Sequence, residues 1–151
     1  MVVVSLESGI KYLTGIHALN LPCSLETTGD WHQSALVWKD LSIRCKSESV
    51  FGDWGIEFEK SIPECDELFA AANHIRACLD LLESGDIIMV YGMCDDFICN
   101  DSYDRWIFEK VMLLRDCVRW LHIDNFMCRE YKCKWLDFKD GVLDANSIWG
   151  E

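Results

Sequence analysis

The sequence predicts an α+β fold, in which an N-terminal antiparallel sheet of three to five strands packs against two long helices of the C-terminal half and a shorter third helix. Two observations lead to this prediction. Apolar and polar residues alternate in short runs before residue 60, whereas apolar residues recur every three or four positions from Ser61 onward. The chain has 151 residues, half of them apolar, which suits a single domain over residues 1–151 with a substantial core.

The strands are predicted from alternation. Residues 41–46 read LSIRCK and residues 54–59 read WGIEFE, with apolar and polar side chains in turn. Such a pattern is typical of a strand that buries one face. The intervening residues 46–53 contain Ser, Gly and Asp, which favour turns, so the two runs are expected to form an antiparallel pair. Residues 10–21 are also expected to be extended.

The first long helix is predicted over residues 61–85. Its start, Ser61-Ile62-Pro63-Glu64, matches a capping box, and Gly85 suits the position just after a last helical turn. Between these ends, apolar residues follow one another at spacings of three and four. They are Cys65, Leu68, Ala72, Ile75, Leu79 and Leu82. This stripe predicts one amphipathic helix with a buried face.

Two further helices are predicted nearer the C-terminus. A wide apolar stripe runs from Tyr103 to Leu121, and Asp124 is a candidate cap for a shorter helix that carries Phe126, Met127, Tyr131 and Trp135. Residues 92–102 are expected to form a loop. Residues 87–91, which read IIMVY, suit either a buried strand or an apolar connection, and periodicity does not choose between them.

The net charge and the cysteines limit the classes of function, and the cellular compartment, that suit this chain. A net charge of −12 opposes direct binding of nucleic acid or of an anionic membrane surface. No run of apolar residues reaches the length of a membrane span, and the opening residues lack the basic start of a signal peptide. The nine cysteines are odd in number, and Cys78 and Cys117 fall in helical stripes, so reduced thiols and a cytoplasmic location are expected.

The acidic residues concentrate in the middle of the chain. Residues 63–102 hold nine acidic residues and one basic residue, a net charge of −8. Charge complementarity around an aromatic anchor suits a basic protein partner, although a solvated helix face would explain the same carboxylates without any partner. The favoured function is a small acidic cytoplasmic interaction protein that binds and inhibits a basic protein, in the manner of an antitoxin, an immunity protein or a nucleic-acid mimic. The predicted binding residues belong to the first helix and the acidic loop, where they are expected to be exposed, and include one tryptophan further upstream. They are Asp66, Glu67, Asp80, Glu83, Asp95, Asp96, Phe97 and Trp31.

The alternative function is a small enzyme that uses residues 17–32. There Cys23 would be the nucleophile, His32 the base and Asp30 the group that orients the imidazole. The spacing of His17, Cys23 and His32 matches no zinc-binding signature. A structural loop explains the same residues without chemistry.

No metal and no cofactor are expected. Asp95, Asp96, Asp101 and Asp104 gather oxygen atoms of the kind that hard cations prefer, but their spacing is not that of a calcium-binding loop. The two C-x4-C pairs, at positions 94 and 99 and at positions 128 and 133, lack the C-x2-C spacing usual for zinc. Phosphate-binding glycine loops and the common hydrolase signatures are likewise missing from the sequence.

Overall fold

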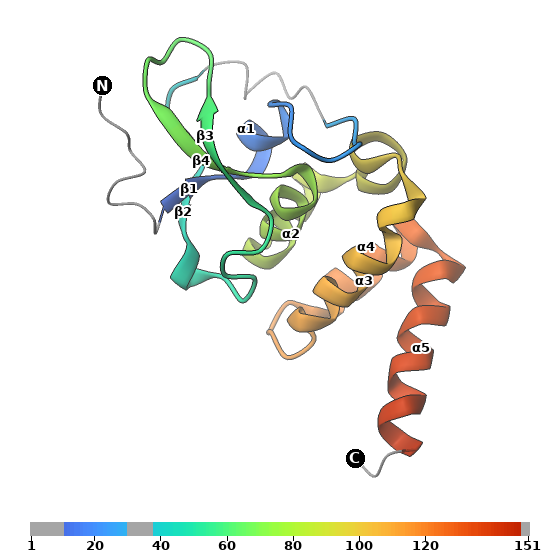
Figure 1. Cartoon of the computed structure of the whole chain (residues 1–151). Coiled ribbons are helices and arrows are strands. Elements are labelled where there is room, and N and C mark those ends of the chain that lie inside the picture. Colours follow the sequence, from blue (N-terminus) through green and yellow to red (C-terminus); the bar gives the residue numbers. More distant parts are fainter. Residues whose placement is uncertain (1–10, 30–37, 149–151) are drawn as a thin grey trace.

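The α+β fold is confirmed in the computed structural model, which describes residues 11–29 and 38–148, with side chains up to Val142 (Figure 1). A four-stranded sheet is formed by the N-terminal half, and most of the helices follow it along the chain. The elements in chain order are β1 (Lys11–Leu13), α1 (Gly15–Leu19), β2 (Ile43–Cys45), η3 (Lys46–Glu48), β3 (Ile56–Ser61), β4 (Leu68–Ala72), α2 (His74–Ser84), η4 (Ile87–Val90), η5 (Met93–Ile98), η6 (Asp101–Tyr103), α3 (Asp104–Val111), η7 (Met112–Leu114), α4 (Trp120–Tyr131) and α5 (Cys133–Ile148).

The sheet is mixed and has the strand order β2-β1-β4-β3. The two outer pairs, β1 with β2 and β3 with β4, are antiparallel, whereas the central pair of β1 and β4 is parallel. The predicted pairing of residues 41–46 with residues 54–59 is therefore wrong, because β1 and β4 lie between the strands that these residues form. Alternation identifies a half-buried strand, but it carries no information about the strand's partner.

The predicted helix over residues 61–85 is correct only in its second half. Strand β3 extends to Ser61, so the capping box expected there is not formed, and residues 68–72 form β4. A central strand that is buried on both faces has a continuous apolar run, and the LFAAA sequence of β4 therefore also fits a helical stripe. Helix α2 instead begins after Asn73, whose side chain accepts a hydrogen bond of 2.8 Å from the backbone N–H of Arg76. It ends, as predicted, at Gly85, which has a φ of +92°.

The predicted helix from Tyr103 to Leu121 is interrupted. Its first part is α3, extended by the short turn η7, and there Ile107, Val111 and Leu114 are buried as the stripe predicts. The chain then turns before α4 begins, which leaves Val118 94% exposed. No proline or glycine marks this turn in the sequence.

The shorter third helix is also divided. Phe126, Met127 and Tyr131 lie on α4, but Trp135 lies on α5, which extends away from the sheet toward the C-terminus (Figure 1). The carboxylate of Asp124 accepts a hydrogen bond of 2.8 Å from the Trp135 indole, so it joins the two helices and does not begin one. Upstream, residues 87–90 form the short helix η4, and the expected loop over residues 92–102 contains η5, a single π-helical turn, and η6.

Apolar clusters cover both faces of the sheet. On one face, Tyr12 of β1 and two alanines of β4 contact the residues of the large helical cluster. On the other face, Leu13 and Phe69 belong to a smaller cluster that also contains Leu21 and Ile62. Among the described residues, no helix combines the length and the apolar character that crossing a membrane requires.

A buried carboxylate connects the sheet to α2. Asp80 is 1% exposed and accepts hydrogen bonds from the hydroxyls of Tyr12 and Thr14, each at 2.7 Å, and from the Nε of Arg76 at 2.9 Å. Arg44 of β2 contacts the same carboxylate at 3.1 Å. Burial, together with the charge of Asp80, raises the pKa of the Tyr12 hydroxyl, which therefore remains a donor.

The prediction that Asp80 and Glu83 are exposed on an acidic helix face is therefore wrong. The Glu83 side chain is 13% exposed and pairs with Arg44 at 3.1 Å. Asp80 also pairs with Arg76, which is 0% exposed. A carboxylate is tolerated at such depth only when it is paired with cations and hydrogen-bonded, and both conditions hold here.

We predict that Asp80→Ala lowers the free energy of unfolding by about 3–5 kcal/mol, because it leaves the buried guanidinium of Arg76 without its carboxylate. The matched control is Asp66→Ala, which removes an exposed carboxylate from the β3–β4 loop and should change stability by less than about 0.5 kcal/mol. Urea unfolding followed by tryptophan fluorescence measures both. Similar losses for the two variants would contradict a dominant role for the buried carboxylate.

Candidate functional site

The predicted acidic residues lie in two separate places. Asp66 is exposed and Glu67 is half-buried, and both belong to the loop between β3 and β4, not to a helix. Asp95 and Asp96 are exposed on η5, in the yellow-green part of the chain in Figure 1, away from that loop. A single acidic strip along residues 63–102 is therefore not formed, because the strand β4 and the buried part of α2 separate its ends.

Phe97, the predicted aromatic anchor, is not available at the surface. It is 5% exposed and belongs to the large apolar cluster. Its backbone carbonyl accepts a hydrogen bond of 2.7 Å from the N–H of Gly29. The expectation of an exposed anchor is therefore wrong, because a π-helical turn directs Phe97 and Ile98 inward while Asp95 and Asp96 face outward. Trp31, the other aromatic residue, lies outside the described residues.

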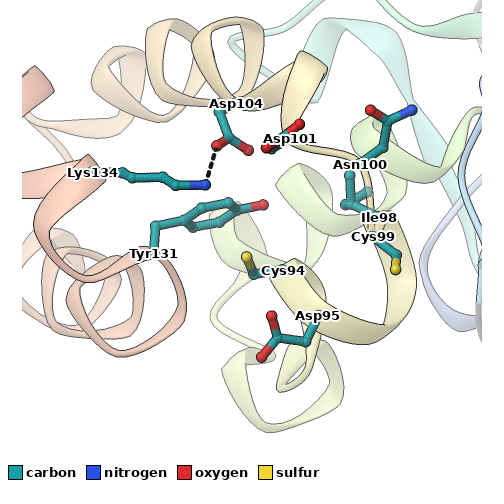
Figure 2. A pocket seen from close by; sticks show the side chains of 9 residues that line it. All are labelled: Cys94, Asp95, Ile98, Cys99, Asn100, Asp101, Asp104, Tyr131 and Lys134. Carbon is teal, nitrogen blue, oxygen red and sulfur yellow. Dashed lines mark hydrogen bonds and ion pairs between the residues drawn. The ribbon is translucent and has the colours of Figure 1, made fainter.

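Next to η5 lies a hollow of about 440 Å³, called here the acidic pocket. Its walls come from η5, from the start of α3 and from the junction of α4 and α5 (Figure 2). Carboxylates of Asp95, Asp101 and Asp104 line it, and Lys134 is the cation among its lining residues. The complete lining is Cys94, Asp95, Ile98, Cys99, Asn100, Asp101, Asp104, Tyr131 and Lys134.

The hydroxyl of Tyr131 has no hydrogen-bond partner among the described residues, although the side chain is only 4% exposed. Figure 2 shows it pointing into the acidic pocket, between Cys94 and the carboxylates of Asp101 and Asp104. Burial, followed by the neighbouring thiols and carboxylates, raises the pKa of Tyr131, which keeps the hydroxyl protonated. A buried hydroxyl without a partner is rare in folded proteins and marks a place where a ligand atom would be stabilised.

An internal cation already uses part of this pocket. The Nζ of Lys134 lies 3.2 Å from a carboxylate oxygen of Asp104, and the lysine side chain is 57% exposed. Burial and the nearby carboxylates, Asp95 first among them, raise the pKa of the Cys94 thiol to about 11. Cys94 is therefore a neutral thiol near pH 7 and does not act as a thiolate nucleophile in this pocket.

The wall formed by η5 is held in place by a neighbouring helix. Glu130 of α4 accepts hydrogen bonds from the backbone N–H groups of Gly92 at 3.2 Å and Cys94 at 2.9 Å. Asn100 caps η6 by accepting a hydrogen bond of 3.1 Å from the N–H of Ser102. Because Asn100 supplies this cap, the Asp101 carboxylate remains at the pocket.

A second hollow, of about 370 Å³, lies where the chain leaves α1, and is called here the thiol pocket. Cys23, Thr27 and His74 line it together with Leu19, Asn20, Leu21, Pro22 and Thr28. The Cys23 Sγ lies 3.6 Å from the Thr27 hydroxyl oxygen, and that oxygen lies 2.6 Å from Nδ1 of His74. His74, the first residue of α2, is 3% exposed.

The hydrogen bonds of His74 fix its tautomer. Its Nε2 lies 2.5 Å from the carbonyl oxygen of Leu21, which can only accept, so Nε2 carries a proton. In the neutral ring, Nδ1 is then the acceptor for the Thr27 hydroxyl, and the Thr27 oxygen in turn accepts from the Cys23 thiol. The three side chains form a continuous path for a proton from sulfur to imidazole.

The protonation equilibria of Cys23 and His74 are coupled. Burial alone would raise the pKa of Cys23, but hydrogen bonds to His74 and Thr27 and the charge of the imidazolium outweigh it, and the pKa is lowered. Burial alone would lower the pKa of His74, yet its bonds to Cys23 and to the Leu21 carbonyl raise it. The pair thus favours a thiolate beside an imidazolium more than two isolated side chains would.

The structure places a different histidine beside Cys23 from the one predicted in the sequence analysis. Cys23 has an imidazole neighbour, but that neighbour is His74, 51 positions away in the sequence, a residue that sequence reasoning missed. His17 instead contacts the hydroxyl of Ser42 at 3.1 Å. Asp30 and His32 lie outside the described residues. No spacing signal in the sequence links residues 23 and 74.

Within residues 11–29 and 38–148, no three His, Cys, Asp or Glu side chains converge in a way that could hold a metal ion. All nine cysteines lie in this part of the chain, and each is a free thiol.

We predict that Gly29→Ala is more destabilising than Gly52→Ala by about 1–3 kcal/mol. Both glycines have positive φ, +77° and +53°, so both variants share the strain of about 1–2 kcal/mol of a left-handed alanine. A Cβ at Gly29 would also lie 2.6 Å from the Leu19 carbonyl and 2.8 Å from the His74 ring, whereas at Gly52 it meets no atom within 4 Å. Chemical denaturation distinguishes them, and equal losses would show that Gly29 does not hold His74 in place.

Comparison of the chain with protein-family models, with curated proteins and with solved structures finds no match. Because no relative indicates a function, the functional proposal depends on the side chains of the acidic pocket and of the thiol pocket.

Proposed function

We propose that this chain is a small acidic interaction protein, which binds a basic protein partner by accepting a lysine or arginine side chain of that partner in the acidic pocket. The observation that carries the proposal is the Tyr131 hydroxyl, buried without a hydrogen-bond partner beside carboxylates from three positions. An N–H of the incoming cation would donate to the Tyr131 oxygen and to a carboxylate, which satisfies the hydroxyl and neutralises charge in one step.

The proposed surface differs from the one predicted from the sequence. Asp80 and Glu83 are neutralised internally, so the carboxylates that remain for a partner near the pocket are those of Asp95, Asp96 and Asp101, all exposed. The net charge of −12 supports this proposal because it raises the rate of encounter with a basic protein. Occupying the cations of such a partner would restrain any action that it has on nucleic acid.

Lys134 acts as an internal stand-in for the partner's cation. Its ammonium lies against Asp104, at the position where an external ammonium or guanidinium would be attracted. Because the lysine side chain is 57% exposed, water screens this ion pair, and it can be displaced at little cost. Binding is therefore a competition between an intramolecular and an intermolecular cation.

The proposal includes a cytoplasmic location. It is supported by the nine free thiols, which a reducing compartment would preserve.

We predict that Lys134→Met increases the affinity for a short oligolysine peptide roughly 3–10-fold, because it removes the competing cation. Asp101→Asn should weaken the same binding, and Asp66→Asn, a matched change on the distant β3–β4 loop, should not. Isothermal titration at low salt measures the three variants, with a repeat at high salt, where screening should weaken binding. Equal affinities for all variants would show that the acidic pocket is not the binding site.

We also predict that Tyr131→Phe stabilises the free protein by about 1–3 kcal/mol and at the same time weakens peptide binding, because the buried hydroxyl has no partner until a ligand supplies one. Thermal unfolding and titration of the same samples give both quantities. The control is Tyr12→Phe, which removes a hydroxyl that is bonded to Asp80 and should therefore destabilise the protein. A loss of stability in Tyr131→Phe would contradict the proposal.

A further inference from the structure

We infer that Cys23, Thr27 and His74 form a second functional site, in which Cys23 is a nucleophile toward an acyl substrate and Thr27 carries the proton of the thiol to His74. This inference is independent of the acidic pocket. It rests on three side chains from two distant parts of the chain that converge on one hollow, with Sγ–Oγ1 and Oγ1–Nδ1 distances of 3.6 and 2.6 Å.

The site has the parts that nucleophilic catalysis by cysteine requires. A thiol is activated by a base within hydrogen-bond reach, and the base is oriented by a third group. Here the Leu21 carbonyl fixes the imidazole through Nε2, and the ring of His74 is packed against the backbone of Gly29. Cys23 itself is half-buried and lines the hollow, so a small substrate can reach the sulfur.

The lining of the thiol pocket indicates the class of substrate. Leu19, Leu21 and Pro22 provide apolar surface, and Asn20 and Thr28 provide polar groups. Among the described residues, no lysine or arginine lines this hollow, and the imidazole of His74 is already engaged by Thr27 and by the Leu21 carbonyl. The hollow therefore has no free cation for a phosphate or a carboxylate. An uncharged acyl group, as in an ester, an amide or a thioester, fits this combination.

The reaction balances with water as the second substrate. The sulfur of Cys23 attacks the carbonyl carbon, an S–C bond forms, and the thiol proton passes through Thr27 to Nδ1 of His74. As the bond to the leaving group breaks, the imidazolium returns that proton to the leaving group. Water then attacks the thioester with His74 as base, which releases the carboxylic acid and restores the thiol.

Other cysteines in the chain do not share this environment. Cys78 is 0% exposed within the apolar core. The pKa of Cys94 is raised to about 11 by burial and by adjacent carboxylates, whereas the pKa of Cys23 is lowered. Burial also raises the pKa of Cys128. The thiolate form is therefore more favourable at Cys23 than in a free cysteine, and less favourable at Cys94 and Cys128.

Alkylation of the intact chain by iodoacetamide, measured for each cysteine by mass spectrometry across pH, tests the inference. The rate at Cys23 should reach half of its maximum at a lower pH than the rates at the exposed thiols Cys99 and Cys133 do. The rate at Cys94 should rise only at alkaline pH. A midpoint for Cys23 equal to or above those of the exposed thiols would overturn the inference.

Variants at Thr27 separate the proton path from a structural role. Thr27→Val keeps the shape of the side chain but removes its hydroxyl, and should move the Cys23 midpoint upward, while Thr27→Ser restores the hydroxyl and the low midpoint. Thr27 is half-buried, and circular dichroism confirms that each variant is folded. If Thr27→Val is folded and leaves the midpoint unchanged, the relay is wrong. His74→Gln, where folded, should give the same upward shift.

A model acyl donor tests the chemical step itself. With p-nitrophenyl acetate, the intact protein should release nitrophenolate and carry the acetyl group on Cys23, and Cys23→Ser should lose most of this release. Cys65→Ser changes another half-buried thiol and should retain the wild-type rate. Acetylation confined to exposed thiols, with equal rates for the two serine variants, would overturn the assignment of Cys23 as the nucleophile.

Discussion

The carboxylate of Asp80 is the interaction on which the rest of the structure depends. It is buried at the contact between α2 and the sheet, and it binds groups from β1, β2 and α2 at distances of 2.7–3.1 Å. Arg76, which is equally buried and pairs with Asp80, also donates hydrogen bonds to the backbone carbonyls of Gly52 and Trp54. Its guanidinium lies over the ring of Tyr12. Burying either the Asp80 carboxylate or the Arg76 guanidinium without the other would cost free energy. The ion pair therefore requires that α2, the two strands and the 52–54 turn adopt one arrangement.

That arrangement also positions the two candidate sites. With α2 fixed on the sheet, its first residue, His74, is placed under the loop that follows α1, and this creates the thiol pocket. The same loop is joined to the segment that lines the acidic pocket. The backbone N–H of Gly29 donates to the Phe97 carbonyl at 2.7 Å. The Asn100 side chain donates to the Glu26 carbonyl at 2.9 Å, and the Glu26 N–H donates to the Tyr103 hydroxyl oxygen at 3.1 Å. The two pockets have no lining residue in common, but these hydrogen bonds connect the segments next to them.

Several elements were predictable from the sequence because local rules decide them. The alternation of apolar and polar residues correctly indicated the edge strands β2 and β3, although their apolar residues Ile43 and Phe58 are exposed. Gly85 ends α2 because the cap needs a left-handed residue. Asp95 and Asp96 are exposed, as predicted. Local rules failed at β4, where burial on both faces removes the alternation, and at the turn before α4, where no proline or glycine interrupts the stripe. They also failed at Asp80, because only the fold places its helical position against the sheet, where Arg44 of β2 joins Arg76 of the same helix around the carboxylate.

The sequence by itself determined the α+β class and the excess of carboxylates, because composition and short-range periodicity carry that information. Only the tertiary structure decided which carboxylates face solvent, which imidazole meets Cys23 and which hydroxyl is left unpaired at Tyr131. Those outcomes depend on contacts between residues far apart in the chain, such as 23 with 74 or 104 with 134. The sequence specifies the chemical type of each side chain, whereas its protonation state, burial and hydrogen-bond partners depend on the residues that the fold places around it.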